Sequence, residues 1–281
     1  MSNSVFVPGH ITGFFTIENH EISLKNGSCG AGFLLSKGVK TTISPADELT
    51  IEVNQGDTTV IDEVLSILEI ETNFKITQDI QLPIGAGFGT SAASALSLTL
   101  ALNEFLDLGY SKELCGQIAH MAEVNLGAGL GDVIAQTGHG MVLRTSSGAP
   151  GIGEIKSFEH DVYIAWKTFG TIETSDIIQD VYHKQVISNA GLKYLELFEK
   201  EPTLKNFLEF SNKFSHEINL MTDEVKNLIE YFNSRSDILG SSMAMLGNTV
   251  FAFAYDEDVF RTLGIEELHI DKLNNIGIVY D

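Results

Sequence analysis

The sequence is poor in cysteine, in proline and in basic residues. Its 281 residues include 2 Cys, 5 Pro, and 17 Lys and Arg against 38 Asp and Glu. Two cysteines are too few for a disulfide framework or a zinc cluster. The formal net charge of −21 argues against nucleic acid and anionic membranes as partners, because both reward clustered Lys and Arg.

Long apolar runs are also lacking. No run approaches the roughly 18 apolar residues of a membrane-spanning helix. The segment Met1–Ser4 has neither the basic segment nor the apolar core of a signal peptide. With 43% hydrophobic residues, the composition is ordinary for a globular protein. We therefore expect a cytoplasmic protein with one large domain or two moderate ones.

Hydrophobic patterning predicts strands followed by helices in each half of the chain. The first 60 residues are β-branched and aromatic runs bounded by Gly, Pro and Asn, and a buried helix is expected over Ser91–Leu106. Amphipathic helices are expected between Ser175 and Phe232, and the turn-rich segment Ser146–Gly153 is the best linker candidate. The sequence thus predicts an α+β protein with domains over residues 1–150 and 151–281.

A glycine-rich loop before a small-residue helix is the most informative segment. Glycine lets the backbone approach a ligand closely and adopt positive φ, and the free N–H groups at the start of a helix favour an anion. The segment therefore predicts a phosphate-binding loop. Its residues are Pro83, Gly85, Ala86, Gly87, Phe88, Gly89, Thr90, Ser91 and Ala92.

This loop differs from the two commonest phosphate-binding loops. A P-loop has a Lys just before the Ser or Thr, where this chain has Gly89. A dinucleotide fingerprint has the spacing G-x-G-x-x-G, whereas the spacing here is G-x-G-x-G. On loop composition alone, a glycine-rich turn before a packed helix remains the alternative.

Two carboxylates and a hydroxyl are candidates for metal binding and proton transfer. Mg²⁺ prefers carboxylate, hydroxyl and water oxygens, so Ser91 and Glu123 are candidates to bind one ion. Asp132 follows the glycine-rich segment 127–131 and is a candidate to accept a hydroxyl proton. Taken singly, Glu123 could be a solvated helix residue and Asp132 a helix N-cap.

Arg144 follows an apolar strand and is a candidate for a buried cation. A guanidinium pairs bidentately with a carboxylate, which suggests a substrate bearing a carboxylate as well as a hydroxyl. An Arg at a strand end in solvent is the alternative. His10 could bind substrate, although a lone His is more often structural, and Ser28 offers a hydroxyl in a tight turn.

Three segments resemble the motifs of the GHMP kinases, which include galactokinase, homoserine kinase and mevalonate kinase. The first is Pro8–His10, and the second is the loop with the pattern P-x-x-x-G-x-G-T-S-A-A that begins at Pro83. The third, Gly240–Asn248, departs from the family because Met, Ala and Leu replace its glycines. Within it, Met243 and Met245 are interpreted as core residues.

The resemblance implies a fold, cofactors and residue roles. The fold would have an N-terminal α/β domain like that of ribosomal protein S5 and a C-terminal ferredoxin-like α+β domain. ATP and Mg²⁺ would be bound, with Ser91 and Glu123 at the metal and Asp132 as base or orienter of the attacking hydroxyl. Phosphoryl transfer would be direct and in line.

A finer resemblance points to one branch of the family, whose members phosphorylate the 4-hydroxyl of pantoate in archaeal coenzyme A biosynthesis. It implies that His10, Ser28 and Arg144 hold pantoate. Homoserine, shikimate and mevalonate stay open as other acceptors, as does a metabolite-binding member without catalysis. A homodimer is expected on base rates. The segments that carry this resemblance are Pro8–Phe15, Gly27–Gly32, Gly129–Gln136 and Met243–Gly247.

Overall fold

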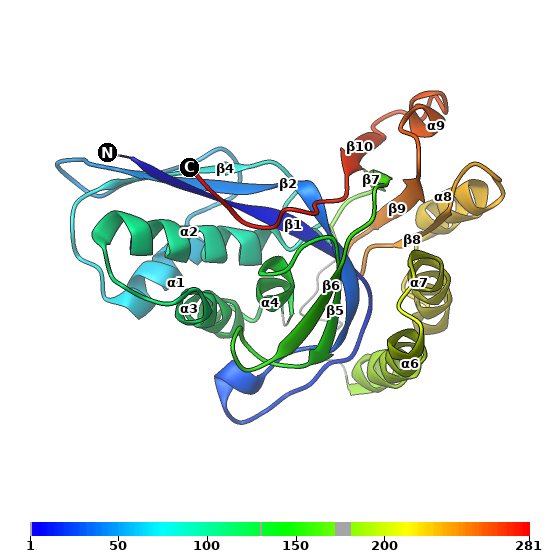
Figure 1. Ribbon diagram of the computed structural model, residues 1–281, viewed down its shortest axis with the longest axis horizontal. Coiled ribbons are helices and arrows are strands. Elements are labelled where there is room, and N and C mark those ends of the chain that lie inside the picture. Colours follow the sequence, from blue (N-terminus) through cyan, green and yellow to red (C-terminus); the bar gives the residue numbers. More distant parts are fainter. Residues whose placement is uncertain (1, 130, 172–180) are drawn as a thin grey trace.

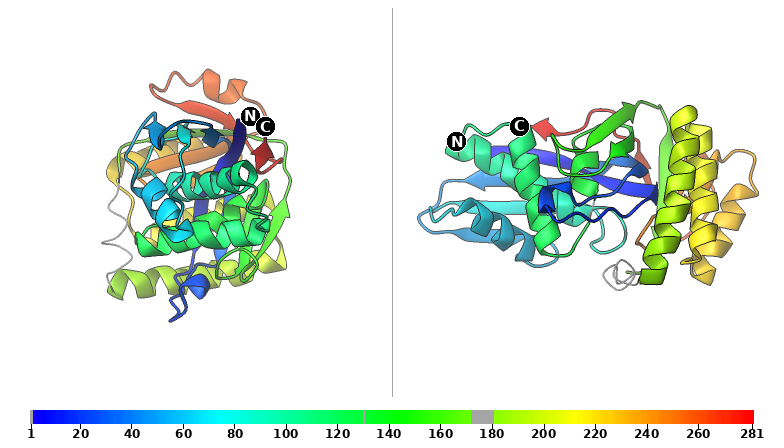
Figure 2. Two further views of the ribbon diagram at one scale, coloured as in Figure 1. Left: turned by 90° about the vertical axis from the view of Figure 1, so that its left-hand side faces the viewer. Right: turned by 90° about the horizontal axis from the view of Figure 1, so that it is seen from below.

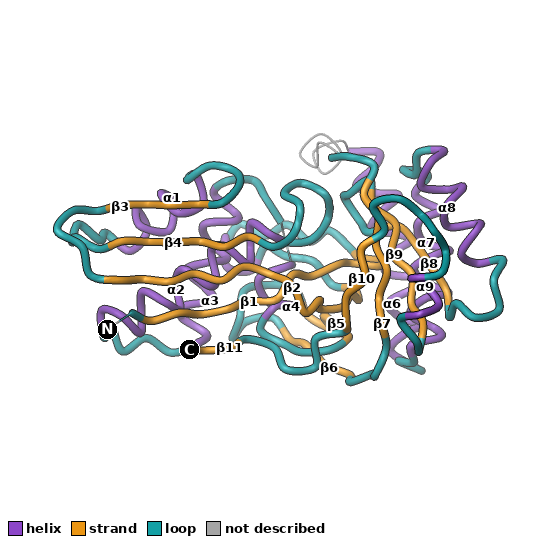
Figure 3. The backbone as a smooth tube through the Cα atoms, turned by 90° about the horizontal axis from the view of Figure 1, so that it is seen from above, coloured by secondary structure: helices purple, strands orange, loops and turns teal. Residues whose placement is uncertain are grey.

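A seven-stranded sheet forms the first part of the computed structural model, which describes residues 2–129, 131–171 and 181–281. Its strands are β1 (Asn3–Phe15), β2 (Gly30–Ser44), β3 (Thr50–Val53), β4 (Lys75–Ile80), β5 (Met141–Ser146), β6 (Glu154–Phe158) and β11 (Val279–Tyr280). The order is β11-β1-β2-β4-β3, and β5 pairs with both β2 and β6. All pairs are antiparallel except β3 with β4. Seen from above, the strands lie side by side with the helices behind them, and the two termini are close (Figure 3).

Helices cover one face of this sheet (Figure 1). They are α1 (Thr59–Leu68), α2 (Thr90–Leu106), α3 (Lys112–Asn125) and the short α4 (Asp132–Gln136), and a 3₁₀ turn, η1 (Ser23–Lys25), precedes β2. Helix α2 is buried along most of its length, which confirms the buried helix predicted over Ser91–Leu106. Its small residues let it lie between β1, β2 and α3. The glycine loop ends at Gly89, because α2 begins at Thr90 and is held in place by its packing on the sheet.

A four-stranded antiparallel sheet forms the second part, in the order β10-β7-β9-β8. Its strands are β7 (Tyr163–Thr168), β8 (Gly240–Met243), β9 (Thr249–Ala254) and β10 (His269–Lys272). Its helices are α6 (Val181–Lys200), α7 (Leu204–Ile218), α8 (Asp223–Asn233) and α9 (Asp258–Arg261). Helices α6 and α7 lie side by side at one end of the molecule and also pack on β1 (Figure 2). The predicted helical region began at Ser175, and its first residues lie outside the described part of the chain.

One aromatic core joins the two parts. Phe33 of β2 packs edge to face against Phe251 and Phe253 of β9, with ring centroids 5.0 and 4.8 Å apart. Phe14 of β1 meets Phe207 of α7 in the same cluster. None of the described helices is long and apolar enough to cross a membrane.

The segment Ser146–Gly153 is not a linker between domains, because it joins β5 to β6 and these two strands pair with each other. Its Gly and Pro content correctly indicated a turn, but composition does not tell what a turn connects. Strands β6 and β11 come after residue 150 and still belong to the first sheet. The division of the chain at residue 150 therefore stays a prediction rather than a boundary between sheets.

Candidate functional site

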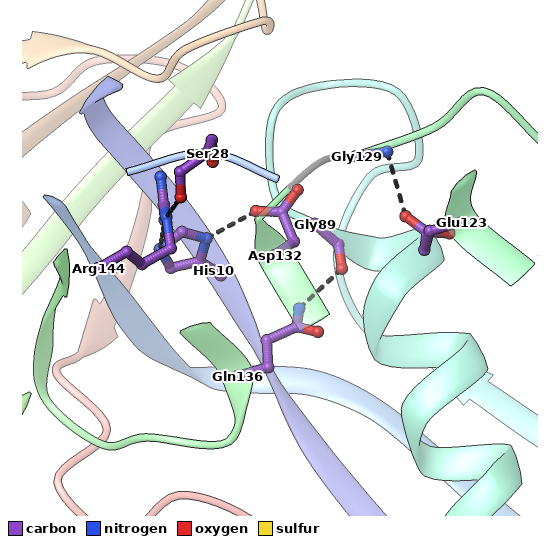
Figure 4. A network of polar contacts seen from close by, with 8 residues as sticks. All are labelled: His10, Ser28, Gly89, Glu123, Gly129, Asp132, Gln136 and Arg144. Atoms are coloured by element: carbon purple, nitrogen blue, oxygen red, sulfur yellow. Dashed lines mark hydrogen bonds and ion pairs between the residues drawn. The ribbon is translucent and has the colours of Figure 1, made fainter. Parts of the chain in front are cut away.

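A cavity of about 500 Å³ lies where the two parts of the molecule meet. Its wall is formed by β1, the glycine loop, the end of α3, the start of α4, β5 and the turn between β8 and β9. Segments far apart in the sequence thus supply one site. Figure 4 shows a network of polar contacts among residues on and next to its wall.

The glycine loop has the backbone that its sequence predicted. Gly85, Gly87 and Gly89 have φ of 72°, 86° and 58°, a region that favours glycine. Gly89 precedes α2, whose first N–H groups lack partners within the helix. Of the predicted loop residues, the cavity wall includes Gly85, Gly87, Phe88, Gly89, Thr90 and Ser91, whereas Pro83, Ala86 and Ala92 lie behind it. The wall at this end is therefore suited to an anion.

The atypical third segment packs directly on the glycine loop. Thr249, the residue that directly follows the segment, donates from Oγ1 to the carbonyl of Ala86 at 2.8 Å. A Cβ on Gly247 would lie 2.1 Å from the same carbonyl oxygen, so only glycine fits there. Met243 and Met245 belong to the buried core, which confirms their interpretation as core residues. Met245 and Leu246 also line the cavity. The segment thus packs on the loop through Gly247, although Met, Ala and Leu replace other glycines of the family's motif.

Ser91 and Glu123 form a hydrogen-bonded pair on the cavity wall. Ser91 Oγ donates to Glu123 Oε1, and the N–H of Gly129 donates to Glu123 Oε2 at 3.2 Å. Glu123 is 1% exposed, so it is not a solvated helix residue. Burial raises the pKa of Glu123 to about 7, against the hydrogen bond from Ser91 and with help from the charge of Asp132.

The buried Glu123 predicts a stability that falls as the pH rises. Its pKa is raised from 4.5 to about 7 on folding, so the folded chain holds the extra proton between these values. The contribution of Glu123 to the free energy of unfolding therefore falls as the pH rises through this window, and it stays at its lower value above pH about 7. We expect Glu123→Gln to gain melting temperature relative to the wild type between about pH 5 and pH 8, measured by calorimetry.

The comparison with Glu123→Gln isolates this group. Burial lowers the pKa of His10, His120, His160 and His269, so these imidazoles also make stability depend on pH, but they are present in both proteins and their contribution cancels in the difference. A melting-temperature difference that stays constant over the same pH range would contradict the raised pKa of Glu123.

Asp132 is held by His10. His10 Nδ1 lies 2.6 Å from Asp132 Oδ1, and a quarter of the Asp132 side chain is exposed. Burial opposes ionisation of Asp132, but the hydrogen bond from His10 and the charge of Arg144 outweigh it and lower the pKa of Asp132. Burial lowers the pKa of His10, so a neutral imidazole donates from Nδ1 to an ionised carboxylate. Asp132 is the first residue of α4 and Gly131 its N-cap, so the N-cap alternative for Asp132 is excluded.

Arg144 is a buried cation, 1% exposed, that lines the cavity. Its Nε donates to the carbonyl of Ser28 at 3.2 Å, and its Nη1 lies 3.4 Å from His10 Nε2. Among the residues that the structure describes, no carboxylate pairs directly with this guanidinium. The solvent-exposed alternative is thus excluded, and a positive charge faces the cavity without a direct counter-ion.

Ser28 and His10 differ in their relation to the cavity. Ser28 lines it, and its Oγ lies so close to Gly131 that a Cβ there would be 2.2 Å away. His10 is fully buried and lies behind Asp132 and Arg144, not on the wall (Figure 4). Of the two, Ser28 alone can meet a ligand directly.

Several wall residues escaped the sequence analysis. Thr12 follows His10 by two positions on β1, and strand periodicity would have placed it on the same face. Phe15, Ile84, Thr171 and Leu246 carry no comparable signal, because their place depends on the packing of the two parts. Gly129 and Gly131 stood in a glycine-rich segment, and they allow the approach of Asp132 and Arg144 respectively.

Comparisons with known proteins find relatives over nearly the whole chain. The family model described as GHMP kinases N terminal domain matches residues 58–140. A pantoate kinase of Methanocaldococcus jannaschii is 35% identical over 268 residues, which cover 93% of this chain and 96% of that protein. A pantoate kinase of Thermococcus kodakarensis is 32% identical over 296 residues, covering 98% of this chain and 93% of that protein.

Solved structures share the fold over the whole chain. One described as a phosphotransferase related to the CoA biosynthesis pathway is 28% identical, with a TM-score of 0.86 and coverage of 100% of this chain and 99% of that one. The mevalonate kinase of Methanococcus jannaschii has a TM-score of 0.70 at 15% identity, covering 98% of both chains. The predicted two-part α+β fold is confirmed by these likenesses.

Proposed function

Because the chain belongs to the GHMP kinase family, whose members are small-molecule kinases, we propose that it transfers the γ-phosphoryl group of ATP to the 4-hydroxyl of pantoate, giving 4-phosphopantoate. The pantoate kinases of two archaea, which match nearly the whole chain, support this proposal. That likeness carries the choice of pantoate, and the buried Arg144 beside Asp132 in one cavity supports an acceptor that, like pantoate, bears a carboxylate and a hydroxyl.

The phosphate end of the cavity suits ATP and Mg²⁺. The N–H groups of the glycine loop and of the start of α2 would bind the phosphates. Ser91 and Glu123 would hold Mg²⁺ through their oxygens, the donors that this ion prefers. When bound, Mg²⁺ offsets the charge that develops on the transferred group. Within the described residues no group of three or more His, Cys, Asp and Glu side chains is placed to hold a metal, so phosphate and water would supply the other ligands.

The acceptor end of the cavity positions pantoate. Arg144 would bind its carboxylate bidentately, with the Ser28 hydroxyl nearby. The Asp132 carboxylate, ionised and oriented by His10, would orient the 4-hydroxyl and take its proton. Phosphoryl transfer depends mainly on positioning and electrostatics, so these contacts account for direct in-line transfer.

The third motif bears on the alternative of a protein without catalysis. Its missing glycines were the one feature that favoured that alternative. Gly247 and Thr249 nevertheless contact the glycine loop closely, so the motif keeps a place at the phosphate end. We therefore favour catalysis, in archaeal coenzyme A biosynthesis and in the cytoplasm, with a homodimer as the expected assembly.

Identification of the product tests the proposal. The protein would be incubated with ATP, Mg²⁺ and pantoate, and the product analysed by phosphorus NMR and mass spectrometry. We expect a stable phosphate monoester on the 4-hydroxyl. Pantoyl lactone, whose ring engages both the hydroxyl and the carboxylate, serves as the matched control and should not react. An acyl phosphate that hydroxylamine cleaves, or no phosphorylated product, would contradict the proposal.

A further inference from the structure

Gln136 connects the glycine loop to the helix that carries Asp132. It is the last residue of α4, four positions after Asp132, so both side chains project from one face of that helix. Gln136 Nε2 donates to the carbonyl of Gly89 at 2.8 Å (Figure 4). Because a carbonyl can only accept, the amide must present its nitrogen to Gly89.

Gly89 contacts both the start of α2 and the helix that carries Asp132. Its carbonyl also accepts the N–H of Ala93 at 3.0 Å, the first bond of α2. A Cβ at Gly89 would lie 3.1 Å from both Asp132 Cγ and Gln136 Nε2. The phosphate end and the proton-accepting carboxylate thus meet at one peptide, and the Gln136 amide is bonded to it.

The Gln136 amide makes a poor contribution to folding. The residue is fully buried, and its Oε1 has no hydrogen-bond partner among the described residues. A buried polar atom without a partner is unfavourable for folding, and an apolar group of the same shape is often tolerated as well or better. Gln136 is also absent from the cavity wall, so contact with substrate does not explain its side chain.

We propose that Gln136 is a positioning residue that sets the place of the glycine loop relative to Asp132. The inference rests on the proposed function, in which the phosphate and the acceptor hydroxyl must be aligned between these two elements. An error of about 1 Å in such alignment can lower a rate about 100-fold, whereas binding of each substrate rests on other contacts. Gln136 therefore acts on kcat rather than on either KM.

Gln136→Met tests this role, because methionine keeps the length of the side chain and loses the hydrogen bond to Gly89. We expect kcat to fall about 10-fold or more, with both KM values within about twofold and no loss of melting temperature. The matched control is Gln117→Met on α3, which removes a bond of the same kind, from Nε2 to the carbonyl of Pro150 at 3.0 Å. That variant should keep the wild-type kcat.

Gln136→Glu adds a second measurement, the pH dependence of kcat, which would not change if Gln136 had only a structural role. A protonated Glu can donate to the Gly89 carbonyl, whereas an ionised one repels both that oxygen and Asp132. We expect its kcat, relative to the wild type, to rise as the pH falls, while the relative kcat of Gln136→Met stays constant. A wild-type kcat in Gln136→Met, or a relative kcat of Gln136→Glu that ignores pH, would overturn the inference.

The wild-type reaction separates this inference from the proposed function. Turnover of the wild type with pantoate tests the proposed function alone. The ratio of variant to wild-type kcat, taken with whichever acceptor the wild type phosphorylates, tests Gln136 alone.

Discussion

Asp132→Asn should lose nearly all turnover and still fold. A positioned general base contributes about 10²- to 10⁴-fold, and asparagine removes the charge and the proton-accepting power of this group. The amide oxygen can still accept the hydrogen bond that His10 donates to Asp132 at 2.6 Å, so the local geometry should survive. We expect kcat to fall about 1,000-fold, with both KM values within a few-fold, in a steady-state assay of ADP release.

Asp237→Asn is the matched control for Asp132→Asn. Asp237 is also an aspartate in an ion pair, with Arg235 at 2.6 Å, but it lies on the surface away from the cavity. It should keep the wild-type kcat. A wild-type kcat in Asp132→Asn would show that this carboxylate is not the base, and the proton would then leave by another route.

Arg144→Met should weaken the binding of pantoate far more than the binding of ATP. Methionine fills most of the buried space but cannot donate to a carboxylate, and charge-assisted hydrogen bonds contribute about 1.5–3 kcal/mol each. We therefore expect the KM for pantoate to rise about 100-fold and the KM for ATP to stay within about threefold. Arg144 is 1% exposed, so folding is checked by melting temperature beside the kinetics.

Two further variants define the role of Arg144. Arg144→Lys keeps the charge without the planar fork and should recover only part of the affinity for pantoate. Arg235→Met, which removes a surface guanidinium paired with Asp237, should change neither KM. Equal increases in the two KM values of Arg144→Met would show that Arg144 does not bind the acceptor specifically.

The parts of the site that local sequence determines were predictable. The alternating glycines of the loop before α2 permit positive φ, and Gly85, Gly87 and Gly89 have it. The run of small residues after them predicted a buried helix, and α2 is one. In these cases each residue's role depends on its immediate neighbours in the chain.

The parts that depend on distant packing were not predictable. His10 and Asp132 are 122 positions apart, and nothing in either segment shows that they are bonded. Met245 was interpreted as a core residue, and only the approach of the second sheet brings it to the cavity wall. Gln136 stood inside a segment quoted for its resemblance, yet its bond to Gly89 appears only when α4 and the loop are seen together.

The net charge of the chain likewise says nothing about where individual charges lie in the fold. A net charge of −21 repels a nucleotide on average, and composition alone offers no site for one. The fold offers a local site, because residues of the glycine loop and the buried Arg144 line one cavity. The proposed binding of a nucleotide would therefore depend on where these groups lie rather than on the number of cations.

ADP release with Mg²⁺ and ATP, measured in parallel against pantoate, homoserine, shikimate and mevalonate, tests the central claim most directly. All four acceptors carry a carboxylate and a hydroxyl that Arg144 and Asp132 could meet in the cavity. The likeness of nearly the whole chain to two pantoate kinases is what predicts turnover with pantoate and little with the other three. Turnover with another acceptor and none with pantoate would keep the fold and contradict the proposed substrate. No turnover with any of the four, from protein shown to bind ATP, would contradict the proposed kinase activity on this set.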